Sequence, residues 1–174
     1  ELVSVNGLTY IIDNKDKSDL ISLVEGHFRG EIMPVEALKG DVFGYSVAEK
    51  SFHTRGMVKI QDGCDNFCSY CIVPYVRGAA VSRPVMQILD NVSKLADLGY
   101  KEIVLTGVNI SSYNYQDTDF SGLIARILDI PGEFRLRISS IEPESLDDRF
   151  IQLFDNPRLC PHLHVCIQSG SDKI

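Results

Sequence analysis

The sequence lacks any apolar run that approaches the length of a membrane span, and no secretory signal opens it. Without a secretory context, its cysteines are expected to be free thiols or metal ligands rather than a disulfide framework. Those cysteines are Cys64, Cys68, Cys71, Cys160 and Cys166. We therefore expect a cytoplasmic protein without membrane contact. Residues 1–52 contain no cysteine, and the chain has neither an initiator Met nor a closing tail, so we interpret it as a fragment.

Basic residues are also fewer than acidic residues. The 174 residues carry 17 Lys and Arg against 24 Asp and Glu, for a net charge of −7. A nucleic-acid surface normally shows a basic face, so this balance argues weakly against one on this chain. A hydrophobic content of 44% is typical of a globular protein. Around the first three cysteines the local charge becomes positive, with Arg55, Lys59, Arg77 and Arg83 against Asp62 and Asp65.

From residue 53 onward, strand and helix patterns alternate. Apolar runs rich in Val, Ile and Leu predict strands buried on both faces at 57–60, 102–106, 135–139 and 163–167. Apolar residues at three- and four-residue steps predict helices within 82–100, 119–130 and 145–156. Ser145 and Asp148 suggest a capping box at the start of the last helix. Repeated strand–helix–strand units imply parallel strands, and we favour an α/β fold with a partial (β/α) barrel over a doubly wound sheet.

The first part of the chain has a different pattern. A strand at 8–14 and a helix at 17–28 indicate the end of a preceding α/β domain, covering residues 1–28. Residues 29–52 have scattered Gly and Pro with no period and are expected to form a linker. Residues 53–174 would then be the first part of the barrel domain.

Three cysteines fall within eight positions of "IQDGCDNFCSYCIVPYVRG", directly after a predicted strand. Thiolates spaced C-x3-C-x2-C suit one corner of an iron–sulfur cluster, with one iron left open. Zinc is the first alternative, with a fourth ligand from His53, Cys160 or His162. Unreactive buried thiols are the second alternative.

Longer motifs carry a family resemblance. "KIQDGCDNFCSYCIVPYVRGAAVSRP", "GYKEIVLTGVNISSY", "RLRISSIEP" and "HLHVCIQSGS" follow in order across residues 53–172. They resemble the radical S-adenosylmethionine (SAM) methylthiotransferases, which modify an adenosine beside the tRNA anticodon. The motifs look most like the enzymes for threonylcarbamoyladenosine, then those for isopentenyladenosine, and more distantly those for an aspartate of a ribosomal protein. A zinc-stabilised binding module without catalysis is the rival from another class.

The resemblance implies that Cys64, Cys68 and Cys71 hold a [4Fe-4S] cluster whose free iron binds SAM. Reduction by a donor such as flavodoxin or ferredoxin would release a 5′-deoxyadenosyl radical, and sulfur would enter C2 of the adenine in tRNA. The family also carries a second [4Fe-4S] cluster on three cysteines of an N-terminal domain, and an RNA-binding domain at the C-terminus. Neither is present in these residues, so the fragment alone is expected to be inactive.

In a parallel β/α barrel, the loops after the strands share one rim. The cysteine segment, 106–109, 139–143 and 168–171 are expected to meet there. By resemblance to the superfamily, the cofactor-binding residues expected on this rim are Tyr70 near the adenine, Thr106 and Gly107 near the amino-acid end, Ser139 and Glu142 near the ribose or ammonium, and Gln168.

Several other polar residues have a structural alternative. Ser139 and Ser140 suit a turn as well as a ligand contact, and Arg77 suits a salt bridge as well as a phosphate or carboxylate. Cys160 and Cys166 are expected to have no chemical role, the first in a loop and the second in a buried strand. His162 and His164 are expected to be ordinary strand residues.

Overall fold

The computed structural model describes residues 4–31, 33–38, 40–44 and 54–173. The chain divides into two compact units, Glu1–Ser46 and Val47–Ile174, and each is described by itself. The boundary that we predict at residues 52 and 53 lies outside the described residues, as does His53. No helix in the described part of the chain is long and apolar enough to cross a membrane.

The described part of the first unit consists of helical turns joined by irregular segments. A 3-10 turn, η2 (Asn14–Asp19), leads into α1 (Leu20–Phe28), and η3 (Val35–Ala37) follows. The predicted helix is confirmed, but the strand predicted at 8–14 is wrong, because residues 8–13 form no strand. No second strand exists among the described residues of this unit, so a strand there would leave its backbone groups without a ladder partner.

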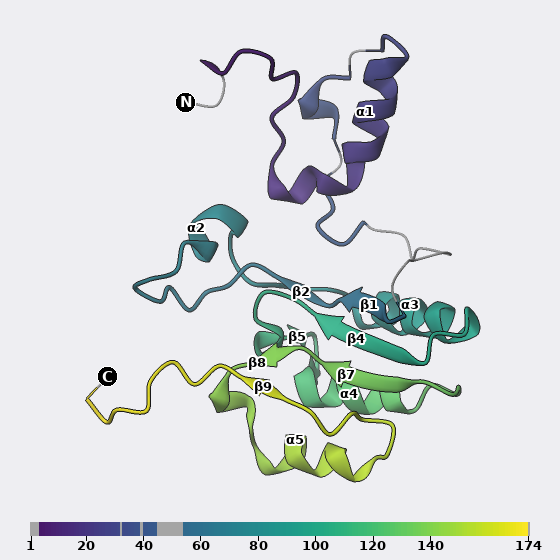
Figure 1. Ribbon diagram of the computed structural model, residues 1–174, viewed down its shortest axis with the longest axis vertical. Helices are drawn as coiled ribbons and strands as arrows, with labels where there is room; N and C mark the ends of the chain where they lie inside the picture. Colours follow the sequence, from purple (N-terminus) through teal and green to yellow (C-terminus); the bar gives the residue numbers. More distant parts are fainter. Residues whose placement is uncertain (1–3, 32, 39, 45–53, 174) are drawn as a thin grey trace. The chain divides into compact units, whose positions relative to one another are not determined.

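The second unit contains a parallel sheet of three strands. Strands β1 (Gly56–Lys59), β4 (Glu102–Thr106) and β7 (Arg135–Ile138) run side by side in that order (Figure 1). Beyond Ser139 the chain continues as β8 (Ser140–Ile141), which pairs in parallel with β9 (His164–Val165). A parallel bridge between Leu136 of β7 and Leu159 brings the chain before β9 alongside β7 as well. The parallel α/β prediction is confirmed, and the sheet is open in the described residues, as in a partial barrel.

The helices of the second unit are α2 (Val73–Arg77), α3 (Val85–Asp97), α4 (Phe120–Leu128) and α5 (Asp148–Gln152), with short turns η4 (Ile110–Ser112), η5 (Pro143–Ser145) and η6 (Leu153–Asp155). The three predicted helices are present as α3, α4 and α5, and the structure adds a short helix, α2, that is not predicted from the sequence. Asp119 caps α4 by accepting from the Gly122 amide. Asp147, not Ser145, caps α5 through the Phe150 amide, so the predicted capping box is wrong.

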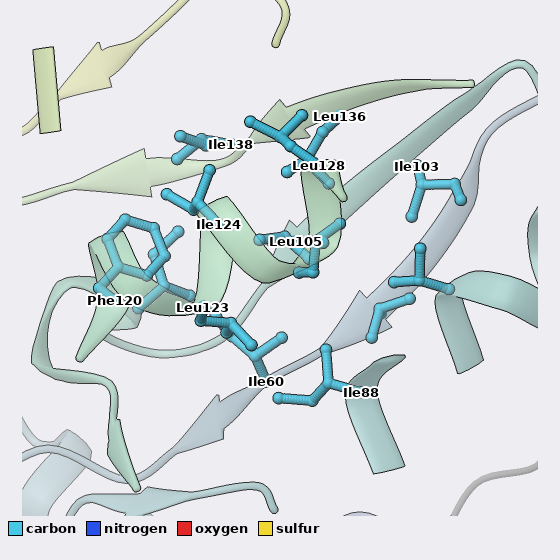
Figure 2. Packing of buried hydrophobic residues seen from close by; sticks show 14 of the residues in the cluster. Ile60, Ile88, Ile103, Leu105, Phe120, Leu123, Ile124, Leu128, Leu136 and Ile138 are labelled. Atoms are coloured by element: carbon cyan, nitrogen blue, oxygen red, sulfur yellow. The ribbon is translucent and has the colours of Figure 1, made fainter. Parts of the chain in front are cut away.

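The core of the second unit lies between the sheet and helices α3 and α4. Figure 2 shows Phe120, Leu123, Ile124 and Leu128 of α4 packed near Leu136 and Ile138 of β7. Ile88 of α3 lies toward Ile60 and the β1 side of the same cluster. Each fully buried Leu or Ile contributes about 2 kcal/mol by removal from water. This core fixes the strands whose carboxyl ends carry the predicted site.

The face of the sheet away from α3 and α4 contradicts the prediction that its strands are buried on both faces. Burial alternates along β1 and β7, so these strands are not buried on both faces. The open face carries Glu102, whose carboxylate lies 2.7 Å from Arg55 Nε, 2.7 Å from Arg137 Nε and 3.3 Å from Arg135 Nη2. The hydrogen bond from Arg137 holds the pKa of Glu102 below its usual value, while burial opposes that shift. Charges on this face are tolerated because opposite charges compensate one another.

Candidate iron–sulfur and cofactor site

The cysteine loop, residues 63–80, leaves the sheet directly after β1. Its base is closed by a two-residue antiparallel pair between β2 (Gln61–Asp62) and β3 (Val81–Ser82). Inside this base the Cys64 amide donates to the Gly78 carbonyl at 3.1 Å, and the Ala80 amide donates to Asp65 Oδ1 at 3.2 Å. The loop therefore has a fixed base, and the chain segment that carries the cysteines extends from it beyond the carboxyl ends of the strands (Figure 1).

Gly63 makes this closure possible. Its φ is +70°, and a Cβ there would lie 2.0 Å from the Ala79 carbonyl oxygen. No other residue fits, because both the backbone conformation and the space exclude a side chain. The chain can therefore turn sharply just before Cys64.

The three cysteines are free and half-buried. The Cys71 amide donates to the Cys68 carbonyl at 2.9 Å, which turns the chain between these two residues. Phe67, directly before Cys68, has a φ of +47°, an uncommon conformation for a residue with a bulky side chain. The thiols are thus carried on a tight, partly solvent-accessible turn.

Asp62 anchors the loop by charge. Its buried carboxylate accepts from Arg77 Nε at 2.8 Å, from Lys59 Nζ at 2.8 Å and from the Gly63 amide at 2.9 Å. Of the two roles that the sequence leaves open for Arg77, the structure shows the salt bridge within the protein. Both ends of the cysteine loop are held by one side chain.

The loop after β4 lies against this base. Thr106 ends β4, and its carbonyl accepts from the Ile60 amide at 2.9 Å. A Cβ at Gly107 would lie 2.9 Å from the Gln61 carbonyl oxygen, so Gly107 allows the two segments to pack closely. Gln61 Oε1 accepts from the Asn109 amide at 2.8 Å and the Val108 amide at 3.1 Å. No sequence motif predicts this role of Gln61, because all its partners are backbone groups, two of them distant in sequence.

Asn109 lies in the predicted rim segment 106–109 but is not among the predicted cofactor-binding residues. It is buried, and its Oδ1 has no hydrogen-bond partner among the described residues. A buried acceptor without a donor is costly unless a ligand or water supplies one. This unpaired oxygen lies in the loop that we predict to meet the amino-acid end of SAM, which carries an ammonium donor.

The third loop reaches the same region. Ser139 lies between β7 and β8, and the Glu142 amide donates to Ser111 Oγ at 2.9 Å in the loop after β4. The pKa of Tyr70 is raised, first by desolvation, then by a hydrogen bond to Cys68 and by the charges of Cys68, Glu142 and Cys71. Tyr70 is thus electrostatically linked to two of the cysteines and to Glu142.

Gln168 and its neighbours are less closely connected to the other three predicted loops. Gln168 is exposed three residues beyond β9, in a segment with local hydrogen bonds such as that from Ser171 N to Ser169 Oγ at 3.1 Å. Closer to the sheet, Ser140 Oγ lies 2.7 Å from His164 Nδ1 across the β8–β9 pair. The structure therefore brings together three of the four predicted loops by direct interactions, and the cofactor role of Gln168 stays a prediction.

The remaining cysteines lie elsewhere. Cys160 is buried at the amino ends of the strands, with its Sγ 3.7 Å from Glu102 Oε2, and burial raises the pKa of its thiol. That position separates Cys160 from the cysteine loop, which leaves the carboxyl ends. Cys166 is half-buried just past β9, not within a buried strand as predicted, and its amide donates to the Ile141 carbonyl. His162 is exposed.

These residues fit the ligand set of a four-iron cluster. A four-iron cluster binds each thiolate at a different iron, so its ligands need not converge on one point. Among the described residues, no three His, Cys, Asp or Glu side chains are grouped to hold one metal ion. Three free thiols on a short turn, with an unpaired buried acceptor on the neighbouring loop, suit a [4Fe-4S] cluster and a ligand with an amino group.

A parallel α/β sheet with a three-cysteine loop after its first strand defines a class of cofactor-dependent proteins. The model of the radical SAM superfamily matches residues 58–174. The chain belongs to this superfamily. In structure it is similar to the radical S-adenosylmethionine methyltransferase TsrM from Kitasatospora setae, with a TM-score of 0.53 and 20% identity, over 63% of this chain and 22% of TsrM. This second comparison concerns the fold alone.

Curated relatives are more similar in sequence. The threonylcarbamoyladenosine tRNA methylthiotransferase MtaB of Chlamydia pneumoniae is 37% identical over 94% of this chain, and that of Thermotoga maritima is 41% identical over 75%. The tRNA-2-methylthio-N(6)-dimethylallyladenosine synthase of Agrobacterium fabrum is 41% identical over 84%. The chain spans only 37%, 31% and 35% of these relatives, respectively.

Proposed function

We propose that the chain is the cluster-binding part of a radical SAM tRNA methylthiotransferase. The observation that carries this proposal is the similarity to MtaB over 94% of the chain, which includes the whole cysteine loop. The fixed base of that loop and its contacts with the loop after β4 support the same assignment.

Cys64, Cys68 and Cys71 would hold a [4Fe-4S] cluster and leave one iron open to SAM. When bound, this pair of cofactors supplies the radical chemistry that activates a C–H bond. Asp62 and Gly63 hold the base of the loop, while Thr106, Gly107 and Asn109 provide backbone and side-chain groups for the amino-acid end of SAM. Tyr70, Ser139, Glu142 and Gln168 are the remaining proposed cofactor contacts.

The substrate class would be tRNA with a hypermodified adenosine beside the anticodon. Threonylcarbamoyladenosine is our first choice, because it is named for the relatives from Chlamydia and Thermotoga. Isopentenyladenosine is the second, since the relative from Agrobacterium is named for the dimethylallyl nucleoside at similar identity. A second cluster, an electron donor such as flavodoxin or ferredoxin, and a cytoplasmic location belong to the same proposal.

Nucleoside analysis of tRNA tests the proposal. A strain that lacks the gene should lose 2-methylthio-threonylcarbamoyladenosine and accumulate the form without sulfur. The wild-type gene should restore the product, while a gene with Cys68→Ala should not. Loss of the methylthio-isopentenyl nucleoside instead would establish the second choice, and an unchanged nucleoside profile would contradict both.

A further inference from the structure

Gln61 has an unusual set of partners for a side chain. It is fully buried, and its Nε2 donates to the carbonyls of Asp62 and Gly63, each at 2.8 Å. Its Oε1 accepts from the amides of Val108 and Asn109 at 3.1 and 2.8 Å. One amide group therefore holds two carbonyls on one side and two amides on the other.

Only a primary amide of this length satisfies all four bonds. A carboxylate would face two carbonyl oxygens without a proton to donate, and an apolar side chain would leave four buried backbone groups unpaired. The orientation of the amide is fixed by its partners. If its O and N were exchanged, the oxygen would face two carbonyl oxygens and the NH2 group would face two backbone N–H groups. The side chain of Gln61 is thus chemically matched to its position.

The two groups of partners belong to different parts of the site. Asp62 and Gly63 come directly before Cys64, whereas Val108 and Asn109 form the loop after β4, 47 and 48 residues away. The other strand at the base of the cysteine loop, β3, is tied to the same part of the chain, because the Asn114 amide donates to Ser82 Oγ at 2.9 Å and Tyr113 Oη donates to the carbonyl of the next residue, Arg83, at 2.8 Å. The base of the cysteine loop and the chain after β4 are therefore joined at two places.

We propose that Gln61 is a positioning residue that sets the distance between the iron-binding cysteines and the loop that receives the amino-acid end of SAM. This inference rests on the proposed function. SAM must reach the open iron and the loop after β4 at the same time, so a change in their separation weakens its binding. All four hydrogen bonds of Gln61 go to backbone groups, so this side chain acts through the two backbone segments that it joins.

The test uses Gln61→Met and Gln61→Glu in the chain after anaerobic reconstitution with iron and sulfide. Gln152→Met is the matched control, because Gln152 is an exposed residue at the end of α5. Iron content per folded chain should stay near the wild-type value in every variant, since the three cysteines are unchanged. The dissociation constant for SAM should rise about tenfold or more in both Gln61 variants and stay unchanged in the control. The effect of SAM on the EPR spectrum of the reduced cluster should weaken in parallel.

Each outcome has one meaning. A Gln61→Met chain with normal iron, normal SAM affinity and a normal EPR response contradicts this inference alone. Loss of folded protein and iron together, with unchanged SAM affinity in the loaded fraction, also contradicts it and shows a purely structural role. If Gln61→Met does not fold, Gln61→Asn replaces it, because its shorter amide cannot span both loops. The deciding quantity is again the dissociation constant for SAM relative to that of the wild type. A wild-type chain that binds iron but not SAM contradicts the proposed function instead.

Discussion

Arg77 and Asp62 join the two ends of the cysteine loop, with Arg77 Nε 2.8 Å from Asp62 Oδ1. Lys59 Nζ lies 2.8 Å from the other carboxylate oxygen, so one buried group compensates two cations. We expect Asp62→Ala to destabilise the fold by about 3 kcal/mol, because it leaves these cations and the Gly63 amide without their partner. Urea unfolding measures this loss. Asp65→Ala, at an exposed position in the same loop, should cost much less; equal losses would contradict the anchoring role of Asp62.

Gly63→Ala should disrupt the cysteine loop more than any other single methyl group there. The added Cβ would meet the Ala79 carbonyl at 2.0 Å and would also occupy a positive-φ position. We expect about 3 kcal/mol or more of destabilisation and a marked loss of bound iron. Gly99→Ala is the control, since Gly99 also has positive φ but open space, and should cost about 1 kcal/mol with no effect on iron. Normal iron binding by Gly63→Ala would show that the loop closes in another way.

Glu102 predicts a pH dependence of stability. The pKa of Glu102 is lowered in the folded state, mainly by Arg137. The contribution of Glu102 to the free energy of unfolding is therefore fully present above the unfolded pKa of 4.5. That contribution is lost as the pH falls below 4.5 through the folded pKa. Near pH 7, Glu102→Gln should be about 2 kcal/mol less stable than the wild type, and the difference should shrink in acid. Unfolding by urea across the pH range checks this. Glu133→Gln, at an exposed surface pair with Lys101, should show little change at any pH.

The cysteines should divide into two groups by iron content. Alanine at Cys64, Cys68 or Cys71 should each abolish cluster binding. Cys160→Ser and Cys166→Ser should keep it, because Cys160 lies beside Glu102 at the other end of the strands. Iron and sulfide assays on folded protein measure the outcome. Loss of iron in Cys160→Ser would replace the open site with a closed one of four thiolates.

Local patterns predicted most of the second unit. The apolar spacing of α4 identified five residues that are all buried, Phe120, Leu123, Ile124, Ile127 and Leu128. The strand predicted at 8–14 failed because a strand needs a partner, which local sequence does not reveal. Two-sided burial of β1 and β7 failed because only one sheet face packs on α3 and α4. Gln61 escaped detection because its partners are backbone groups, two of them 47 and 48 residues away. Asn109 was identified only as part of segment 106–109, because the sequence does not reveal that its side chain is buried.

EPR spectroscopy of the anaerobically reconstituted and reduced chain, with and without SAM, decides whether the three cysteines hold a cluster with an open iron. We predict a brown protein with a [4Fe-4S] signal that SAM changes, because three cysteines leave one iron open to it. Cys68→Ala should lack the signal. A colourless protein that holds one zinc ion per chain, or a cluster signal that SAM leaves unchanged, would contradict the open-iron site.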